Sequence, residues 1–146
     1  MILSRHSLLA IASVVDVALH ARPAPVAAKA LAARHGLPPR HLETLLQSLV
    51  RAGILKGVRG PRGGYELARE RRRISAGDIV RAALETHEPG AAEDSRLLAL
   101  VVGPMVDEAA RTFLGALDEI TVDELCQRAA RQAVFAGSDA GTDFTI

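Results

Sequence analysis

The 146-residue sequence contains a single cysteine, Cys126. One thiol excludes an intrachain disulfide framework and any site that needs two thiolates from one chain. A chain with so little cysteine fits a reducing compartment, and we expect a cytoplasmic protein. Residues 1–21 are rich in apolar side chains, but no small-residue cleavage site follows them, so they predict a helix rather than a secretion signal. Four polar residues also interrupt this stretch: Arg5, His6, Asp16 and His20.

Signatures of catalysis and metal binding are missing as well. The five histidines show no ligand spacing: His6, His20, His35, His41 and His87. No nucleophile elbow, phosphate-binding glycine loop or paired-carboxylate site is recognisable. The glycines of residues 60–64 do not lie between a buried strand and a helix, which excludes a dinucleotide fingerprint. We therefore expect no enzymatic activity, no metal and no cofactor.

The charge is divided unevenly along the chain. With 49% hydrophobic and 24% charged residues, the sequence suits one domain with an extension. Residues 1–73 hold 13 Lys and Arg against 4 Asp and Glu, a net charge of +9, whereas residues 74–146 hold 5 against 13, a net charge of −8. A basic half is typical of a protein that binds a polyanion. Uneven surface decoration is the alternative interpretation.

One stretch organises the rest of the chain. Residues 59–65 read RGPRGGY, which cannot form a helix interior, and short strand-like segments at 54–58 and 65–67 flank them. This pattern predicts a basic β-hairpin. The helical pattern of residues 38–52 comes directly before it, and a helix followed by such a hairpin is typical of the winged helix-turn-helix fold. We predict a mainly α-helical fold with a small β-hairpin.

Two helices precede this unit. Residues 3–21 have the apolar spacing of a helix buried on more than one side, and Pro23 and Pro25 end it. Residues 26–35 form an alanine-rich helix that stops at Gly36. The helix of residues 38–52 buries an apolar stripe: Leu42, Leu45, Leu46, Leu49 and Val50. Its opposite face is polar: Arg40, His41, Glu43, Thr44, Gln47 and Ser48. Hydrogen-bonding groups on the second helix of such a pair are what reading the major groove requires.

Further elements follow the hairpin. The arginines within residues 69–73 indicate a solvated face. Ser75 and Asp78 resemble a capping box at the start of a fourth helix, and Thr121 and Glu124 begin a last helix that runs to residue 134. We expect a loose tail from residue 137 onwards.

The long helix predicted over residues 95–117 is apolar on two faces. Its own domain can cover one face, so we expect the other to meet the same helix of a second subunit. Complete burial within a monomer is the weaker alternative, because 146 residues offer little to wrap it. Gly103 and Pro104 should kink or restart the helix. The expected dimerisation residues are Leu98, Val102, Val106, Ala110, Phe113 and Leu117.

Several segments together resemble a known family. They are Leu3 and Ser4, Leu42 and Glu43, residues 52–55, residues 58–65, residues 67–69, Ile74 with Asp78 and Ile79, and residues 120–125. The chain resembles the Rrf-two family of bacterial winged-helix regulators over nearly its whole length, most specifically at residues 59–65. Arg62 departs there, at a position that is often glycine.

The resemblance implies a homodimer joined by the long helix, with the helix of residues 38–52 in the major groove and Arg59 in the minor groove of DNA. By position, Arg40, His41, Glu43 and Thr44 would face the DNA. The expected DNA-binding set also includes Arg5, Pro39, Gln47, Gly60 and Arg62.

Cluster-bearing members of the family carry three cysteines in the region that corresponds to residues 88–102. None is present here, and Asp94 and Leu100 lie near where thiolates would be expected. Thiolates are the ligands that an iron–sulfur cluster demands, so this sensing chemistry does not transfer. Cys126 lies in the last helix, and we interpret it as a buried, inert thiol rather than a redox switch.

The sequence thus predicts a dimeric, sequence-specific DNA-binding transcription regulator without an iron–sulfur cluster. We expect a repressor, because a dimer that covers a promoter needs no activating surface. The alternative is a winged-helix module that binds a protein, as a scaffold or as a regulatory subunit. The predicted organisation is a DNA-binding domain over residues 1–87, a connector with the dimerisation and last helices over residues 88–136, and a flexible tail over residues 137–146.

Overall fold

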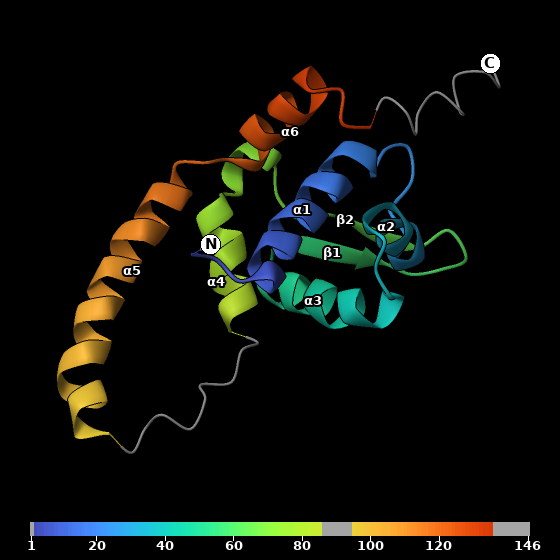
Figure 1. Ribbon diagram of the computed structural model, residues 1–146. Helices are drawn as coiled ribbons and strands as arrows, with labels where there is room; N and C mark the ends of the chain where they lie inside the picture. The colour runs from blue at the N-terminus through green and yellow to red at the C-terminus, as the bar shows by residue number, and fades with distance from the viewer. Residues whose placement is uncertain (1, 86–94, 136–146) are drawn as a thin grey trace.

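The computed structural model describes residues 2–85 and 95–135. The predicted connector over residues 88–94 and the predicted tail over residues 137–146 lie outside the described residues. The elements are α1 (Arg5–His20), α2 (Ala28–His35), α3 (Pro39–Arg51), β1 (Leu55–Val58), β2 (Gly64–Leu67), the 3-10 turn η1 (Arg71–Arg73), α4 (Ala76–Leu84), the π-helical turn η2 (Leu98–Val102), α5 (Gly103–Asp118) and α6 (Val122–Arg131). The predicted fold class, mainly helical with one antiparallel hairpin, is confirmed (Figure 1).

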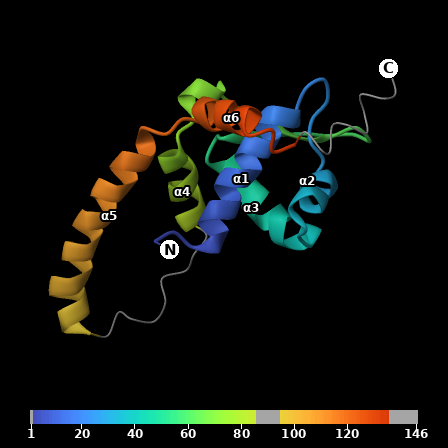
Figure 2. The same cartoon turned by 45° about the horizontal axis from the view of Figure 1, so that its top comes forward.

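The core forms around α1, which lies at the centre of the domain in both views (Figures 1 and 2). Val14 and Val17 of α1 are fully buried, as are Leu45 of α3 and Ile79 of α4, and Val122 of α6 closes the same cluster. The helices that were predicted before and after the hairpin therefore share one hydrophobic core.

α1 ends within one residue of its predicted end and α2 ends at its predicted position, but each helix begins two residues later than predicted, at Arg5 and Ala28. The Ser4 side chain accepts a hydrogen bond from the Ser7 amide and caps α1. α2 ends at Gly36, whose φ of 63° lies in the left-handed region that glycine adopts without strain. A tight corner at Gly36 and Leu37 then leads into α3.

Four leucines of α3 form the predicted buried stripe, but two residues differ from the prediction. Ser48 was placed on the polar face, yet only 4% of it is exposed. Its hydroxyl can be buried because it donates a hydrogen bond of 3.0 Å to the Thr44 carbonyl of the same helix. Val50 was placed in the buried stripe, yet it is 36% exposed. The buried stripe therefore turns towards Ser48 at the end of α3.

The hairpin pairs Leu55 with Leu67 and Val58 with Gly64. A single bridge adds Val26, which exchanges backbone hydrogen bonds of 2.9 and 2.8 Å with Tyr65. A Cβ atom on Gly64 would overlap the Val26 carbonyl, so the close approach requires glycine there. The segment before α2 thereby fixes the base of the hairpin against the helical domain.

The starts of α4 and α6 lie side by side. Ser75 and Thr121 form an antiparallel bridge, in which the Ala76 amide donates to the Ile120 carbonyl at 2.7 Å. The capping box of α4 is confirmed, with Asp78 supplying the second hydrogen bond. The capping box of α6 is only half formed. Thr121 accepts from the Glu124 amide, but the Glu124 carboxylate lies 3.7 Å from Arg128 one turn further on.

The arginine run after the hairpin is not simply a solvated face. Arg71 Nε lies 2.9 Å from the Asp123 carboxylate, and Arg72 Nε lies 3.9 Å from it. Both arginines are exposed, as predicted, but α6, which is distant in sequence, returns to place a carboxylate against η1.

The long helix restarts where it was predicted to do so. Pro104 has no amide to donate, and the chain forms a π-helical turn from Leu98 to Val102, with the Gly103 amide bonded to the Leu98 carbonyl. α5 then extends away from the domain (Figure 1), and none of its residues is buried. Among the described residues, no helix is long and apolar enough to span a membrane.

Candidate nucleic-acid interface

α3 presents the predicted polar face to solvent. Arg40, His41, Glu43, Thr44 and Gln47 are all exposed. Pro38 and Pro39 occupy the N-cap and first position, where a missing amide costs no helical hydrogen bond. The leucine stripe holds the opposite side in the core, so this helix is fixed in orientation while its exposed face carries donors and acceptors that can reach base edges.

The hairpin tip is the second part of the site. Arg59, Gly60 and Arg62 are exposed, and Gly60 has a φ of 112°, a conformation that residues with a side chain rarely adopt. The Gly63 amide donates to the Gly60 carbonyl at 2.9 Å and closes the turn. In Figure 1 this tip lies at the same side of the domain as the first turns of α3. Both predicted contact elements are therefore exposed, and Figure 1 shows them at one side of the domain.

The charged side chains of this face are available for a partner. Within the described part of the chain, no ion pair involves Arg40, Glu43, Arg59 or Arg62. In contrast, Arg34, Lys56, Arg71 and Arg81 are all paired with carboxylates elsewhere in the domain. Unpaired cations on a helix and a wing suit the phosphates and grooves of DNA.

Arg5 is exposed but lies elsewhere. It is the first residue of α1, and that end of α1 lies towards α4, on the opposite side of the domain from the hairpin tip in both views (Figures 1 and 2). A single chain therefore does not group Arg5 with the hairpin tip.

The predicted dimerisation residues divide into two groups. Val102, Val106 and Ala110 are exposed, whereas Leu98, Phe113 and Leu117 are half-buried. The most exposed large apolar side chains include Met105, Leu97 and Leu100, at 69%, 66% and 65%. These three were not in the predicted set. The π-helical turn explains the shift, because it adds a residue to one turn and rotates the apolar face that a regular helical period would predict.

A buried polar cluster was missed by sequence reasoning. The Asp16 side chain is fully buried, and Arg34, His20 and His35 all contact its carboxylate. The spacing of Asp16 and His20, four residues apart on one helix, was the available signal. The contacts of Asp16 with Arg34 and His35 depend on how α2 packs on α1. The spacing of residues in the sequence does not reveal this packing.

A helix-turn-helix pair followed by a basic hairpin, with available charges on both, defines a winged helix-turn-helix DNA-binding protein. The model of the Rrf2 family, described as iron-dependent transcriptional regulators, matches residues 3–128, and the chain belongs to this family. It is therefore a DNA-binding transcriptional regulator. The family is one of regulators rather than enzymes.

Three similar proteins carry regulator names. An HTH-type regulator of Synechocystis, slr0846, is 42% identical over 60% of this chain, and the chain spans 59% of that relative's length. The solved structure of T. potens IscR is 32% identical, covers 88% of both chains and superposes with a TM-score of 0.68. CymR, the global cysteine regulator of B. subtilis, is 26% identical, with 88% of this chain and 98% of that chain covered and a TM-score of 0.65.

The residues that the structure describes do not fit the iron implied by the family's description. Cys126 is the only cysteine of the chain, it is 2% exposed and it lies on α6. Burial is the main cause that raises the pKa of its thiol, with a smaller contribution from Asp123, while Arg71 opposes the shift. Within residues 2–85 and 95–135, no three His, Cys, Asp or Glu side chains are grouped to hold a metal ion. One buried, protonated thiol does not supply the ligands of an iron–sulfur cluster.

Proposed function

We propose that this regulator binds a two-fold-symmetric operator as a homodimer and represses transcription without an iron–sulfur cluster. The observation that carries the proposal is the exposed apolar surface of η2 and α5. Met105 and Val106 are 69% and 59% exposed, and Leu97 and Leu100 precede them. A soluble monomer rarely exposes a continuous apolar patch of this kind, so a second copy is the partner that covers it.

The attachment of α5 supports its use as a dimerisation arm. Arg81 of α4 donates to Asp118 at the end of α5 through two nitrogens, at 2.6 and 3.0 Å. This hydrogen bond is the main cause that lowers the pKa of the Asp118 carboxyl. Gly77 lies against the same carboxylate, where a Cβ atom would overlap Asp118. The end of α5 is thus fixed to the domain while the rest of the helix remains free to pair.

Pairing two arms would present two copies of α3 and the wing on one duplex. In helix-turn-helix dimers, the two recognition helices enter the major groove about 34 Å apart, one helical turn of DNA. In this proposal the exposed α3 residues Thr44 and Gln47 read base edges. Arg59 enters the minor groove, and Arg62 contacts phosphate.

Repression is the simplest outcome of such binding, because a dimer that covers a promoter excludes polymerase without any activating surface. The proposed location is the cytoplasm, where a regulator would meet a bacterial chromosome. Arg5 would contact DNA only if the duplex extends past the end of α3 towards the start of α1. This residue is therefore the least supported member of the predicted set.

Selection of bound duplexes from a random pool tests the proposal directly. We expect an inverted repeat whose half-sites lie about 10 base pairs apart, bound by two chains per duplex. Enrichment of a single half-site bound by one chain would contradict the dimer. Failure to enrich any sequence at low salt would favour the alternative, a winged-helix module that binds a protein.

A further inference from the structure

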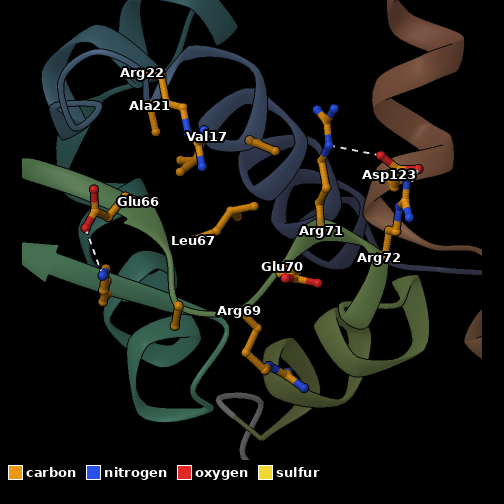
Figure 3. Close-up of a pocket in the computed structure, with 13 residues that line it drawn as sticks. Val17, Ala21, Arg22, Glu66, Leu67, Arg69, Glu70, Arg71, Arg72 and Asp123 are labelled. Atoms are coloured by element: carbon orange, nitrogen blue, oxygen red, sulfur yellow. Dashed lines mark ion pairs between the residues drawn. The ribbon is translucent and has the colours of Figure 1, made fainter.

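A second candidate site lies behind the hairpin, away from the proposed DNA contacts. A cavity of about 800 Å³ is walled by the end of α1, the hairpin, residues 68–72 and the start of α6 (Figure 3). Among the described residues that line it, none belongs to α3 or to the hairpin tip. Its volume lies within the range of about 300–1,000 Å³ that small-molecule sites occupy.

The walls of the cavity carry an excess of positive charge. Five of the lining residues are basic: Arg22, Lys56, Arg69, Arg71 and Arg72. Three are acidic: Glu66, Glu70 and Asp123. Lys56 pairs with Glu66 at 3.0 Å, and Asp123 is shared by Arg71 and Arg72. Arg69 lies 4.0 Å from the Asp78 carboxylate, which is outside the cavity lining, whereas Arg22 is exposed and takes part in no ion pair among the described residues. The five basic lining residues outnumber the three lining carboxylates.

An apolar surface lies between these charges. Ala18 of α1, Ala21 just after α1 and Leu67 of β2 are half-buried and line the cavity together with the fully buried Val17, and Figure 3 shows Leu67 near its centre with Arg22 and Arg71 towards its edges. Such a surface suits the carbon skeleton of a ligand, and the surrounding guanidinium groups suit its charged ends.

We propose that this cavity binds a small organic anion that carries at least two phosphate or carboxylate groups, and that this anion is the regulator's effector. The effector role rests on the proposed function. The bound anion contacts Arg22, and it competes with Asp123 for Arg71 and Arg72. It also lies beside Lys56 on β1, so one ligand contacts the wing and η1 together.

The position of Asp123 explains how binding is transmitted. Its carboxylate accepts from Gln127 at 2.8 Å as well as from Arg71, in the first turn of α6. α6 follows α5 after three residues, and its start is bridged to α4 through Thr121. An anion that takes Arg71 from Asp123 therefore releases one attachment of α6, next to the end of the dimerisation arm. By linkage, DNA and the anion then alter each other's affinity by the same factor.

Calorimetric titration of the full chain, without DNA and at constant ionic strength, tests binding. The probes are pyrophosphate for phosphate groups and citrate for carboxylates. We expect saturable binding of at least one probe, and the one that binds identifies the chemistry. Arg22→Gln and Arg72→Gln should each weaken it about tenfold, which is the loss of one charge-assisted hydrogen bond. Asp123→Asn should tighten binding, because it frees both arginines. Arg131→Gln is the matched control, an exposed arginine on α6 outside the cavity, and should leave binding unchanged.

Two results would overturn the site. One is the absence of binding by both probes. The other is equal binding by wild type, the Arg22 and Arg72 variants and the control, which indicates general attraction to a basic protein. Binding that leaves the affinity for the selected duplex unchanged would overturn the effector role. Because the titration contains no DNA, a failure of operator binding leaves its result standing, and the two proposals fail separately.

Discussion

Arg34 on α2 donates to the Asp16 carboxylate on α1 from two nitrogens, at 2.9 Å from Nε and 2.6 Å from Nη2. The Asp16 side chain is fully buried, and ring nitrogens of His20 and His35 lie 3.1 and 3.0 Å from its oxygens. A buried carboxylate in such a network is stable only while its partners remain in place. This contact fixes α2, the first helix of the helix-turn-helix pair, on the central helix of the domain.

Replacing Asp16 should therefore destabilise the fold. We expect Asp16→Asn to lower the free energy of unfolding by about 1.5–3 kcal/mol, the value of a hydrogen bond to a charged group. Glu43→Gln is the matched control, because it also converts a carboxylate to an amide but on the exposed face of α3. Urea denaturation of both variants measures the difference. Equal stability of the two variants would show that the network contributes nothing net.

The dimerisation arm gives a prediction about assembly. Val106→Glu should produce monomers or aggregates, because it places a charge within the apolar face that a second copy would bury. Val134→Glu is the control, since Val134 is 61% exposed, close to the 59% of Val106, but lies after α6. Light scattering gives the mass of each variant. If Val106→Glu and Phe113→Glu both remain dimeric, the interface lies elsewhere.

Cofactor content gives a third prediction. Protein purified without oxygen should be colourless and should contain neither stoichiometric iron nor sulfide, because each chain supplies one buried thiol. Cys126→Ala should bind the selected duplex as wild type does. Stoichiometric iron and sulfide, lost in Cys126→Ala, would contradict the account of this residue.

The fold was largely predictable, because each helix has its own periodic apolar stripe and its own end signal. Each of these signals depends only on residues a few positions apart in the sequence. Examples are the leucines of α3, the Gly36 stop and the Ser75 capping box. The arginine run at 69–73 and the Asp16 network were not predictable, because both depend on contacts between segments distant in sequence. The high exposure of Leu100 and Met105 was not predicted, because it depends on the π-helical turn from Leu98 to Val102, and sequence spacing does not reveal a change of helical period.

Substitutions in α3 should change the base preference of the protein without changing the salt dependence of its binding. Thr44→Ala and Gln47→Ala should change which bases are preferred in selected duplexes, by about 1–3 kcal/mol at the affected position, because these side chains are proposed to contact base edges. The slope of log affinity against log salt should stay close to that of wild type, since no phosphate contact is lost. An unchanged base preference in both variants would move the reading surface away from these residues.

The most direct test of DNA binding by α3 and the wing is affinity measured against salt concentration, on the selected duplex and on random duplex. Arg59→Ala should weaken specific binding by about 1–3 kcal/mol per subunit, most strongly at sites with A·T flanks, because a guanidinium in the minor groove reads its width. Arg62→Ala should weaken both duplexes about equally and reduce the magnitude of the salt slope by about 1 per lost contact, so by about 2 in a dimer. If both variants bind both duplexes like wild type at every salt concentration, the hairpin is not a DNA-binding wing.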